Sequence, residues 1–125
     1  MVDFNKAPCI YWSLKQKTDW LERYLIIHCI LYYELDNSII SDKDFDSCGR
    51  QLLQFKKQLG SEFKNTEYYY VFKDWDNSTG FYVWDRLTKF DKEYLKRIAN
   101  QVLISYKESL RNVNKNASKQ RKRKA

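Results

Sequence analysis

The sequence predicts a small, mainly α-helical domain, and three observations support this fold class. The 125-residue chain contains only three Gly and one Pro, which is too few turn-forming residues for a many-stranded β sandwich. Apolar residues recur at three- and four-residue spacings in three long segments, as on one face of a helix. Hydrophobic residues make up 43% of the chain, with four Trp, ten Tyr and seven Phe. We therefore expect one domain with a single core.

A first helix is expected over about residues 18–36. Thr18 or Asp19 can cap its first free amide groups. Its core face carries apolar residues three or four positions apart, namely Leu21, Tyr24, Ile27, Leu31 and Leu35. A neighbouring face carries His28, Tyr32 and Asp36 at four-residue spacing. This polar and aromatic face is where a ligand would be met.

A second helix is expected over residues 42–59. Ser41 is a strong N-cap with Asp44 three residues later, which resembles a capping box, and Gly60 supplies a stop. The apolar face consists of Phe45, Cys48, Leu52, Phe55 and Leu59. Because only a short turn joins the two helices, they form a hairpin.

Residues 66–87 allow two interpretations. Strand-like runs at 68–72 and 81–84 flank an Asp-Asn-Ser-Thr-Gly turn, which is typical of a β-hairpin. Phe81, Trp84 and Leu87 instead step by three, and Ser78 or Thr79 can cap a short helix. Short helices are favoured because the rest of the chain is helical.

A last helix is expected over about residues 91–111, with its apolar positions facing inward: Leu95, Ile98, Val102, Tyr106 and Leu110. Residues 115–125 carry six basic residues and no acid, out of a net charge of +7 for the chain. We therefore expect one domain over 1–114 and a disordered basic tail over 115–125. The tail is either a solubilising end or a weak, non-specific nucleic-acid contact through Lys119, Arg121, Lys122, Arg123 and Lys124.

The stretch 31–46 combines paired tyrosines with spaced carboxylates: Tyr32 and Tyr33, then Asp36, then Ile40-Ser41-Asp42, Phe45 and Asp46. With the leucine-spaced helix that follows, it resembles the small N-terminal Ia domain of bacterial NAD⁺-dependent DNA ligases, over about residues 20–59. In that family the domain closes over the nicotinamide mononucleotide (NMN) half of NAD⁺.

The resemblance implies a site made of Tyr32, Tyr33, Asp42, Phe45 and Asp46. Tyr33 occupies a position that is His or Tyr in the family. Phe45 occupies one that is usually Tyr, so a phenol hydroxyl is missing there, and Ser38 stands where Pro is often found. The chemistry agrees, because aromatic faces attract a cationic ring and carboxylates complete its pairing. The alternative interpretation is that the tyrosines pack and the acids stabilise a helix start.

The rest of a ligase has no counterpart in this sequence. There is no Lys-x-Asp-Gly nucleophile motif, oligonucleotide-binding barrel, zinc finger or helix-hairpin-helix repeat. We therefore expect a non-catalytic, free-standing module that binds NMN or NAD, similar to phage-encoded accessory proteins. A second possibility is a protein-interaction factor, such as an inhibitor of a host or defence protein, that uses an aromatic surface from Tyr68 to Trp84. The third is a nucleic-acid-binding accessory protein.

No metal is expected. His28 is the only histidine, and Cys9, Cys29 and Cys48 lack the spacing of a zinc site. Asp74 to Asp85 echoes a calcium loop, but its glycine falls one position late and an Asn or Asp turn is the simpler interpretation. The odd number of widely spaced cysteines favours reduced thiols. No apolar run approaches the roughly 20 residues that cross a bilayer. These features predict a cytoplasmic protein without membrane contact, and the resemblance to the ligase domain implies a bacterial host cell.

Overall fold

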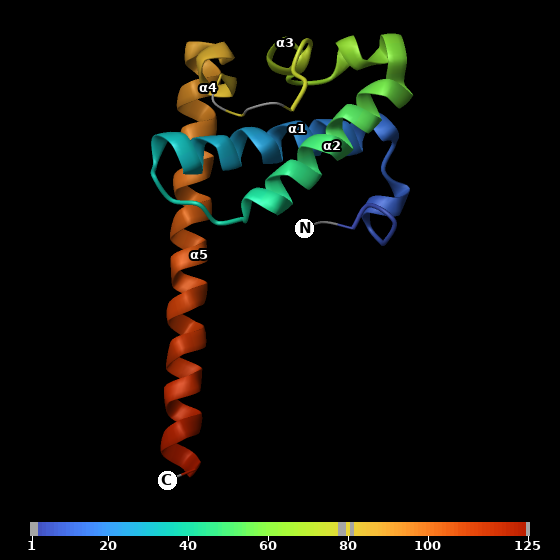
Figure 1. Ribbon diagram of the computed structural model, residues 1–125. Helices are drawn as coiled ribbons and strands as arrows, with labels where there is room; N and C mark the ends of the chain where they lie inside the picture. The colour runs from blue at the N-terminus through green and yellow to red at the C-terminus, as the bar shows by residue number, and fades with distance from the viewer. Residues whose placement is uncertain (1–2, 78–79, 81, 125) are drawn as a thin grey trace.

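The computed structural model describes residues 3–77, 80 and 82–124, with side chains described as far as residue 114. It is mainly α-helical, as the sequence predicts, and has no strand in those residues. Its elements are η1 (Cys9–Tyr11), α1 (Leu14–Cys29), η2 (Ile30–Glu34), α2 (Asp42–Leu59), η3 (Gly60–Asn65), α3 (Tyr69–Phe72), α4 (Val83–Arg86) and α5 (Lys89–Lys124). Figure 1 shows a compact body of helices and the long helix α5, which runs far beyond it.

Helix α1 begins at Leu14, about one turn before the expected start at Thr18 or Asp19. Its cap is Ser13, whose hydroxyl accepts from the Gln16 amide at 3.1 Å, while the Gln16 side chain accepts from the Ser13 amide at 2.8 Å. Thr18 instead donates to the Leu14 carbonyl at 2.7 Å, and Asp19 accepts from the Glu67 amide at 2.9 Å. The two expected caps are therefore used inside the helix and in a contact with another segment.

The end of this helical segment widens into a turn of π-helix, η2. The Leu35 amide donates to the Ile30 carbonyl, five residues back, at 3.0 Å. The Asn37 amide then donates to the Leu31 carbonyl at 2.8 Å, and Asp36 adopts a positive φ of 50°. Asp36 thus occupies the left-handed position that commonly ends a helix, and the bond from Asn37 to Leu31 closes the widened last turn. The segment therefore stops close to the expected residue 36.

Helix α2 has the expected bounds, Asp42–Leu59. The Ser41 hydroxyl accepts from the Asp44 amide at 3.1 Å, and Gly60 ends the helix with φ 58°. Its buried face carries Cys48, Gly49, Leu52 and Phe55, and it packs against α1. The expected helical hairpin is therefore present, with α2 crossing α1 (Figure 1).

Residues 66–87 form the short helices α3 and α4 rather than a β-hairpin, within the residues described. The candidate caps Ser78 and Thr79, and the position of Phe81, lie outside the described residues. The segment is fixed to α1 by Glu22, which has no exposed surface. Its carboxylate accepts from the Thr66 hydroxyl at 2.9 Å and from the Tyr68 amide at 3.2 Å. Burial nevertheless raises the pKa of Glu22 to about 7.

Helix α5 covers Lys89–Lys124, longer than the expected 91–111. Leu95 and Ala99 are fully buried against the body, but Tyr106 and Leu110 are 39% and 47% exposed. The prediction that these two residues face the core is wrong, because the helix has already passed the body at that point (Figure 1). The backbone of residues 115–124 continues the helix where we expected a disordered tail. Lys, Arg, Gln and Ala, which dominate this segment, are strong helix formers.

A bilayer-crossing helix is not found among the residues described: none there is both long enough and apolar enough.

Candidate functional site

A cavity of about 330 Å³ opens where the end of the first helical segment, the start of α2 and the loop after α3 meet. Its walls are formed by His28, Cys29, Tyr32, Tyr33, Ser38, Ile39, Ile40, Asp42, Phe45, Asp46, Asn77 and Gly80. All five residues that the sequence nominated for a ligand site are among them. Asp36, which the sequence placed on the same face as Tyr32, is not.

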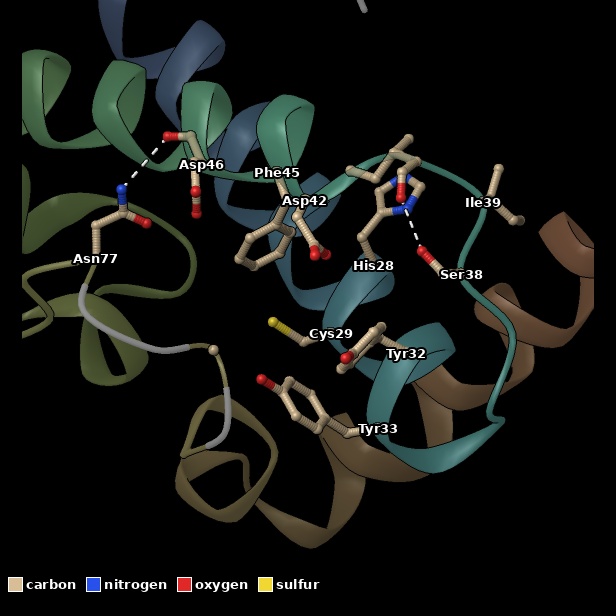
Figure 2. Close-up of a pocket in the computed structure, with 12 residues that line it drawn as sticks. His28, Cys29, Tyr32, Tyr33, Ser38, Ile39, Asp42, Phe45, Asp46 and Asn77 are labelled. Atoms are coloured by element: carbon tan, nitrogen blue, oxygen red, sulfur yellow. Dashed lines mark hydrogen bonds between the residues drawn. The ribbon is translucent and has the colours of Figure 1, made fainter.

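The two tyrosines come from η2, where the helix is wider than an α-helix. Tyr32 is 50% and Tyr33 is 41% exposed. Their rings meet edge to face, with centroids 4.7 Å apart and planes at 82°. Figure 2 shows the Tyr33 phenol reaching towards the Cys29 sulfur, with the Tyr32 ring and the Asp42 carboxylate on the same opening. The cavity therefore offers aromatic surface in two orientations.

The acidic wall comes from the beginning of α2. Asp42 and Asp46 are one turn apart, and both are exposed. Phe45 lies between them in sequence and is partly buried, with its ring turned into the opening (Figure 2). Ser41 caps this helix directly before Asp42, so the cap sets where the helix starts and thereby which residues face the cavity.

The far wall comes from the loop that holds Asn77 and Gly80. The Asn77 amide group donates to the Asp46 carbonyl at 3.3 Å (Figure 2). Its side chain rests on Gly49 of α2, where a Cβ would lie 2.0 Å from the Asn77 oxygen Oδ1. At Gly80 a Cβ would lie 2.9 Å from the Cys29 sulfur and 3.2 Å from the Phe45 ring. Both glycines therefore permit close approach of this loop to the two helices.

The back of the cavity holds two neutral groups. His28 is 8% exposed, and burial lowers its pKa to about 4. Its ring packs against Tyr24 at 4.3 Å between centroids, and its Nδ1 atom has no hydrogen-bond partner within the described residues. Burial likewise raises the pKa of Cys29 to about 12. At neutral pH these groups are an uncharged imidazole and a thiol.

The sequence predicted wall residues that are close together in the chain, but it did not predict those that come from a distant segment. Asn77 and Gly80 were interpreted only as turn residues. Gly49 is the sequence signal for this contact. A glycine in the middle of α2 costs about 1 kcal/mol of helix stability relative to Ala. A glycine retained there requires a packing reason, and Asn77 supplies it.

The other candidate sites are placed differently. The tail residues Lys119, Arg121, Lys122, Arg123 and Lys124 lie outside the described side chains. The aromatic surface expected from Tyr68 to Trp84 for a protein partner is only partly exposed. Tyr68, Phe72 and Trp75 are buried, Tyr69, Tyr70 and Trp84 are partly buried, and Tyr82 is 56% exposed.

Two further residues of this segment, Tyr70 and Asp74, make contacts within the fold. The Tyr70 hydroxyl donates to Asp91, and Asp74 pairs with Arg86 at 3.0 Å. These bonds hold α3, α4 and the start of α5 together. Within the described part of the chain, no three or more His, Cys, Asp or Glu residues are grouped so that they could hold a metal ion.

Comparison of the chain with protein-family models, with curated proteins and with solved structures gave no match. The resemblance to the ligase Ia domain therefore depends on the residues of the stretch 31–46.

Proposed function

We propose that the cavity binds the nicotinamide mononucleotide half of NAD⁺, or NMN itself, without catalysing a reaction on it. The observation that carries the proposal is that Tyr32, Tyr33, Asp42, Phe45 and Asp46 line one cavity. The resemblance selected these residues from the sequence alone. They come from two different helical segments, so their convergence on one cavity was not guaranteed by their order in the chain.

The chemistry of the walls suits a flat cation. The pyridinium ring of oxidised nicotinamide carries a positive charge, and an aromatic face attracts such a ring by about 0.5–2 kcal/mol. Tyr32, Tyr33 and Phe45 offer those faces, while the Asp42 and Asp46 carboxylates offer acceptors for the cation and for ribose hydroxyls. The cavity volume, about 330 Å³, lies at the low end for ligand pockets. It suits a mononucleotide better than a whole dinucleotide.

Thermal-shift and calorimetric titrations with NMN test the proposal. NMN is expected to raise the melting temperature, because a ligand that binds only the folded state stabilises it. Reduced NMN, whose ring is neutral, and AMP are the ligand controls and are expected to give much smaller shifts. If NMN and AMP give equal shifts, or neither gives any, the proposal is wrong.

Two variants assign binding to the cavity. Tyr32→Ala and Asp46→Ala are expected to remove most of the NMN response. Tyr11→Ala is the matched control, since Tyr11 is 84% exposed and does not line the cavity. If Tyr11→Ala weakens NMN binding as much as Tyr32→Ala does, the ligand binds elsewhere.

Phe45→Tyr tests the same site through an expected gain in NMN affinity. It restores the hydroxyl that the ligase domains usually have at this position, and one added hydrogen bond is worth about 1 kcal/mol. We expect NMN to bind about fivefold more tightly to this variant. Weaker binding would mean that the ligand does not approach this edge of the Phe45 ring.

A further inference from the structure

The charge of this protein differs in sign between helix α5 and the rest of the chain. The 36 residues of α5 carry twelve basic and three acidic side chains, a net charge of +9. Residues 1–88 carry eleven basic and thirteen acidic side chains, a net charge of −2. Figure 1 shows that most of α5 extends away from the body. A long, projecting and strongly basic helix is a surface that attracts polyanions.

The start of α5 adds a second, independent feature. Phe90 and Tyr94, one turn apart, are 75% and 41% exposed. Their rings are nearly parallel, at 9°, with centroids 6.3 Å apart. Parallel rings with centroids this far apart are offset rather than directly stacked, and the exposed fractions show that part of each residue faces solvent. A phenylalanine that is three-quarters exposed contributes little to the core.

One basic side chain lies beside this pair. Arg97 follows Tyr94 by three residues and is exposed, so it lies on the same side of the helix. Lys92 and Lys96 lie on the opposite side of the helix, where their ammonium groups are 5.3 Å and 5.8 Å from the Trp84 ring centroid.

Two acidic residues are also close to the pair. Asp91 accepts a hydrogen bond from the Tyr70 hydroxyl, and Glu93 is exposed. Four basic residues, Lys89, Lys92, Lys96 and Arg97, outnumber these two acids over residues 89–97. The positive charge then continues along the helix through the exposed Lys107 and Arg111, with Glu108 between them, to the basic residues of 115–124.

We propose that α5 binds single-stranded nucleic acid, with unpaired bases stacking on Phe90 and Tyr94 and phosphates following the basic side chains of the helix. Exposed aromatic rings and a row of cations are the two elements that proteins use to hold single strands without reading their sequence. A duplex keeps its bases stacked on one another and cannot use the rings. This surface is distinct from the cavity and extends the contact beyond the tail that the sequence nominated.

Fluorescence anisotropy with a labelled 12-residue oligothymidine tests the proposal on the full chain. Phe90→Ala/Tyr94→Ala is expected to weaken binding at least tenfold. The dependence of affinity on salt should stay unchanged, because no phosphate contact is lost. Arg97→Gln is expected to weaken binding and also to lower the salt slope by about 0.7.

The matched control on the same helix is Leu110→Ala. Leu110 is 47% exposed and follows the buried Ala99 by eleven residues, about three turns, so it lies on the side away from Phe90. Binding by this variant should equal that of the unmodified chain. Circular dichroism of each variant establishes that the helix content is unchanged.

Three results would overturn the proposal. The first is equal affinity for oligothymidine and for polyglutamate, because the rings would then contribute nothing. The second is undiminished oligothymidine binding by Phe90→Ala/Tyr94→Ala. The third is no binding of oligothymidine at 50 mM salt, and binding to vesicles of anionic lipid in that case would assign α5 to a membrane surface.

Discussion

The body depends on buried apolar side chains, whereas the projecting part of α5 is mostly exposed and strongly charged. In the body, helices α1 and α2 bury residues such as Leu25 and Leu52 almost completely, and a shaped cavity remains between them and the loop at Asn77. In α5 beyond Val102, every side chain described except that of Leu103 is exposed, and the net charge of the whole helix is +9. The body is organised to fix the geometry of a small site, whereas α5 presents charge along its length. The two regions should therefore respond to different perturbations.

The largest difference is expected in stability. Leu25 has no exposed surface, so Leu25→Ala should destabilise the fold by about 2–5 kcal/mol through lost burial and the cavity left behind. Leu110→Ala on α5 should change the free energy of unfolding by less than about 0.5 kcal/mol. Urea denaturation followed by circular dichroism measures both. Comparable losses would show that α5 beyond Val102 packs against something in solution.

Salt should separate the two binding surfaces almost as strongly. For oligothymidine bound through about five phosphates, raising salt from about 50 to 200 mM should cost roughly 100-fold in affinity. NMN in the cavity should lose far less, because its contacts are short-range and partly enclosed. Anisotropy and calorimetry at the two salt concentrations provide the comparison. Similar salt dependence for both ligands would place NMN on the basic helix.

The pH dependence of stability sharpens the description of the body. Folding raises the pKa of Glu22 from its ordinary 4.5 to about 7, so folding favours the protonated carboxyl. Its stabilising contribution is present in full below pH 4.5 and is lost as pH rises through about 7.

Glu22→Gln removes this titration while keeping the side-chain shape. Between about pH 5 and 8, the unmodified chain should lose about 2 kcal/mol of stability relative to the variant. The shift of His28 acts in the opposite direction but is common to both chains and cancels. A stability difference that does not change with pH would mean that Glu22 titrates normally.

A smaller effect is expected from the glycine contact behind the cavity. In Gly49→Ala the added Cβ would lie 2.0 Å from the Asn77 oxygen, so the Asn77 side chain must move away from α2. NMN affinity is expected to fall about fivefold, since the cavity wall shifts while the helix itself gains about 1 kcal/mol. Calorimetry measures the affinity, and thermal unfolding measures the stability. Unchanged affinity would show that the loop is not part of the ligand wall.

Helix bounds were predictable where local chemistry decides them. Ser41 and Gly60 mark the ends of α2 through their own backbone contacts, so their positions could be read from the sequence. The start of α1 was misplaced because Ser13 with Gln16 also forms a capping box. Thr18 and Asp19, which resembled caps, were engaged elsewhere. Only the packed structure distinguishes these options.

The wrong prediction for the end of α5 has a different reason. Its apolar spacing continues past the point where the body ends, so periodicity alone predicted burial for Tyr106 and Leu110. The residues of the cavity were also predictable only in part. Tyr32 through Asp46 are close in sequence and could be grouped, whereas Asn77 reaches the site only because the chain folds back over Gly49.

The most direct test of two separate surfaces is one NMR experiment on the full chain, with backbone and aromatic signals followed during two titrations. NMN is expected to shift the signals of Tyr32, Tyr33, Asp42, Phe45 and Asp46 and to leave those of Phe90, Tyr94 and Arg97 in place. Oligothymidine is expected to do the reverse. If NMN leaves the signals of the cavity unmoved, or shifts those of α5 equally, the central claim that the cavity recognises nicotinamide nucleotide is contradicted.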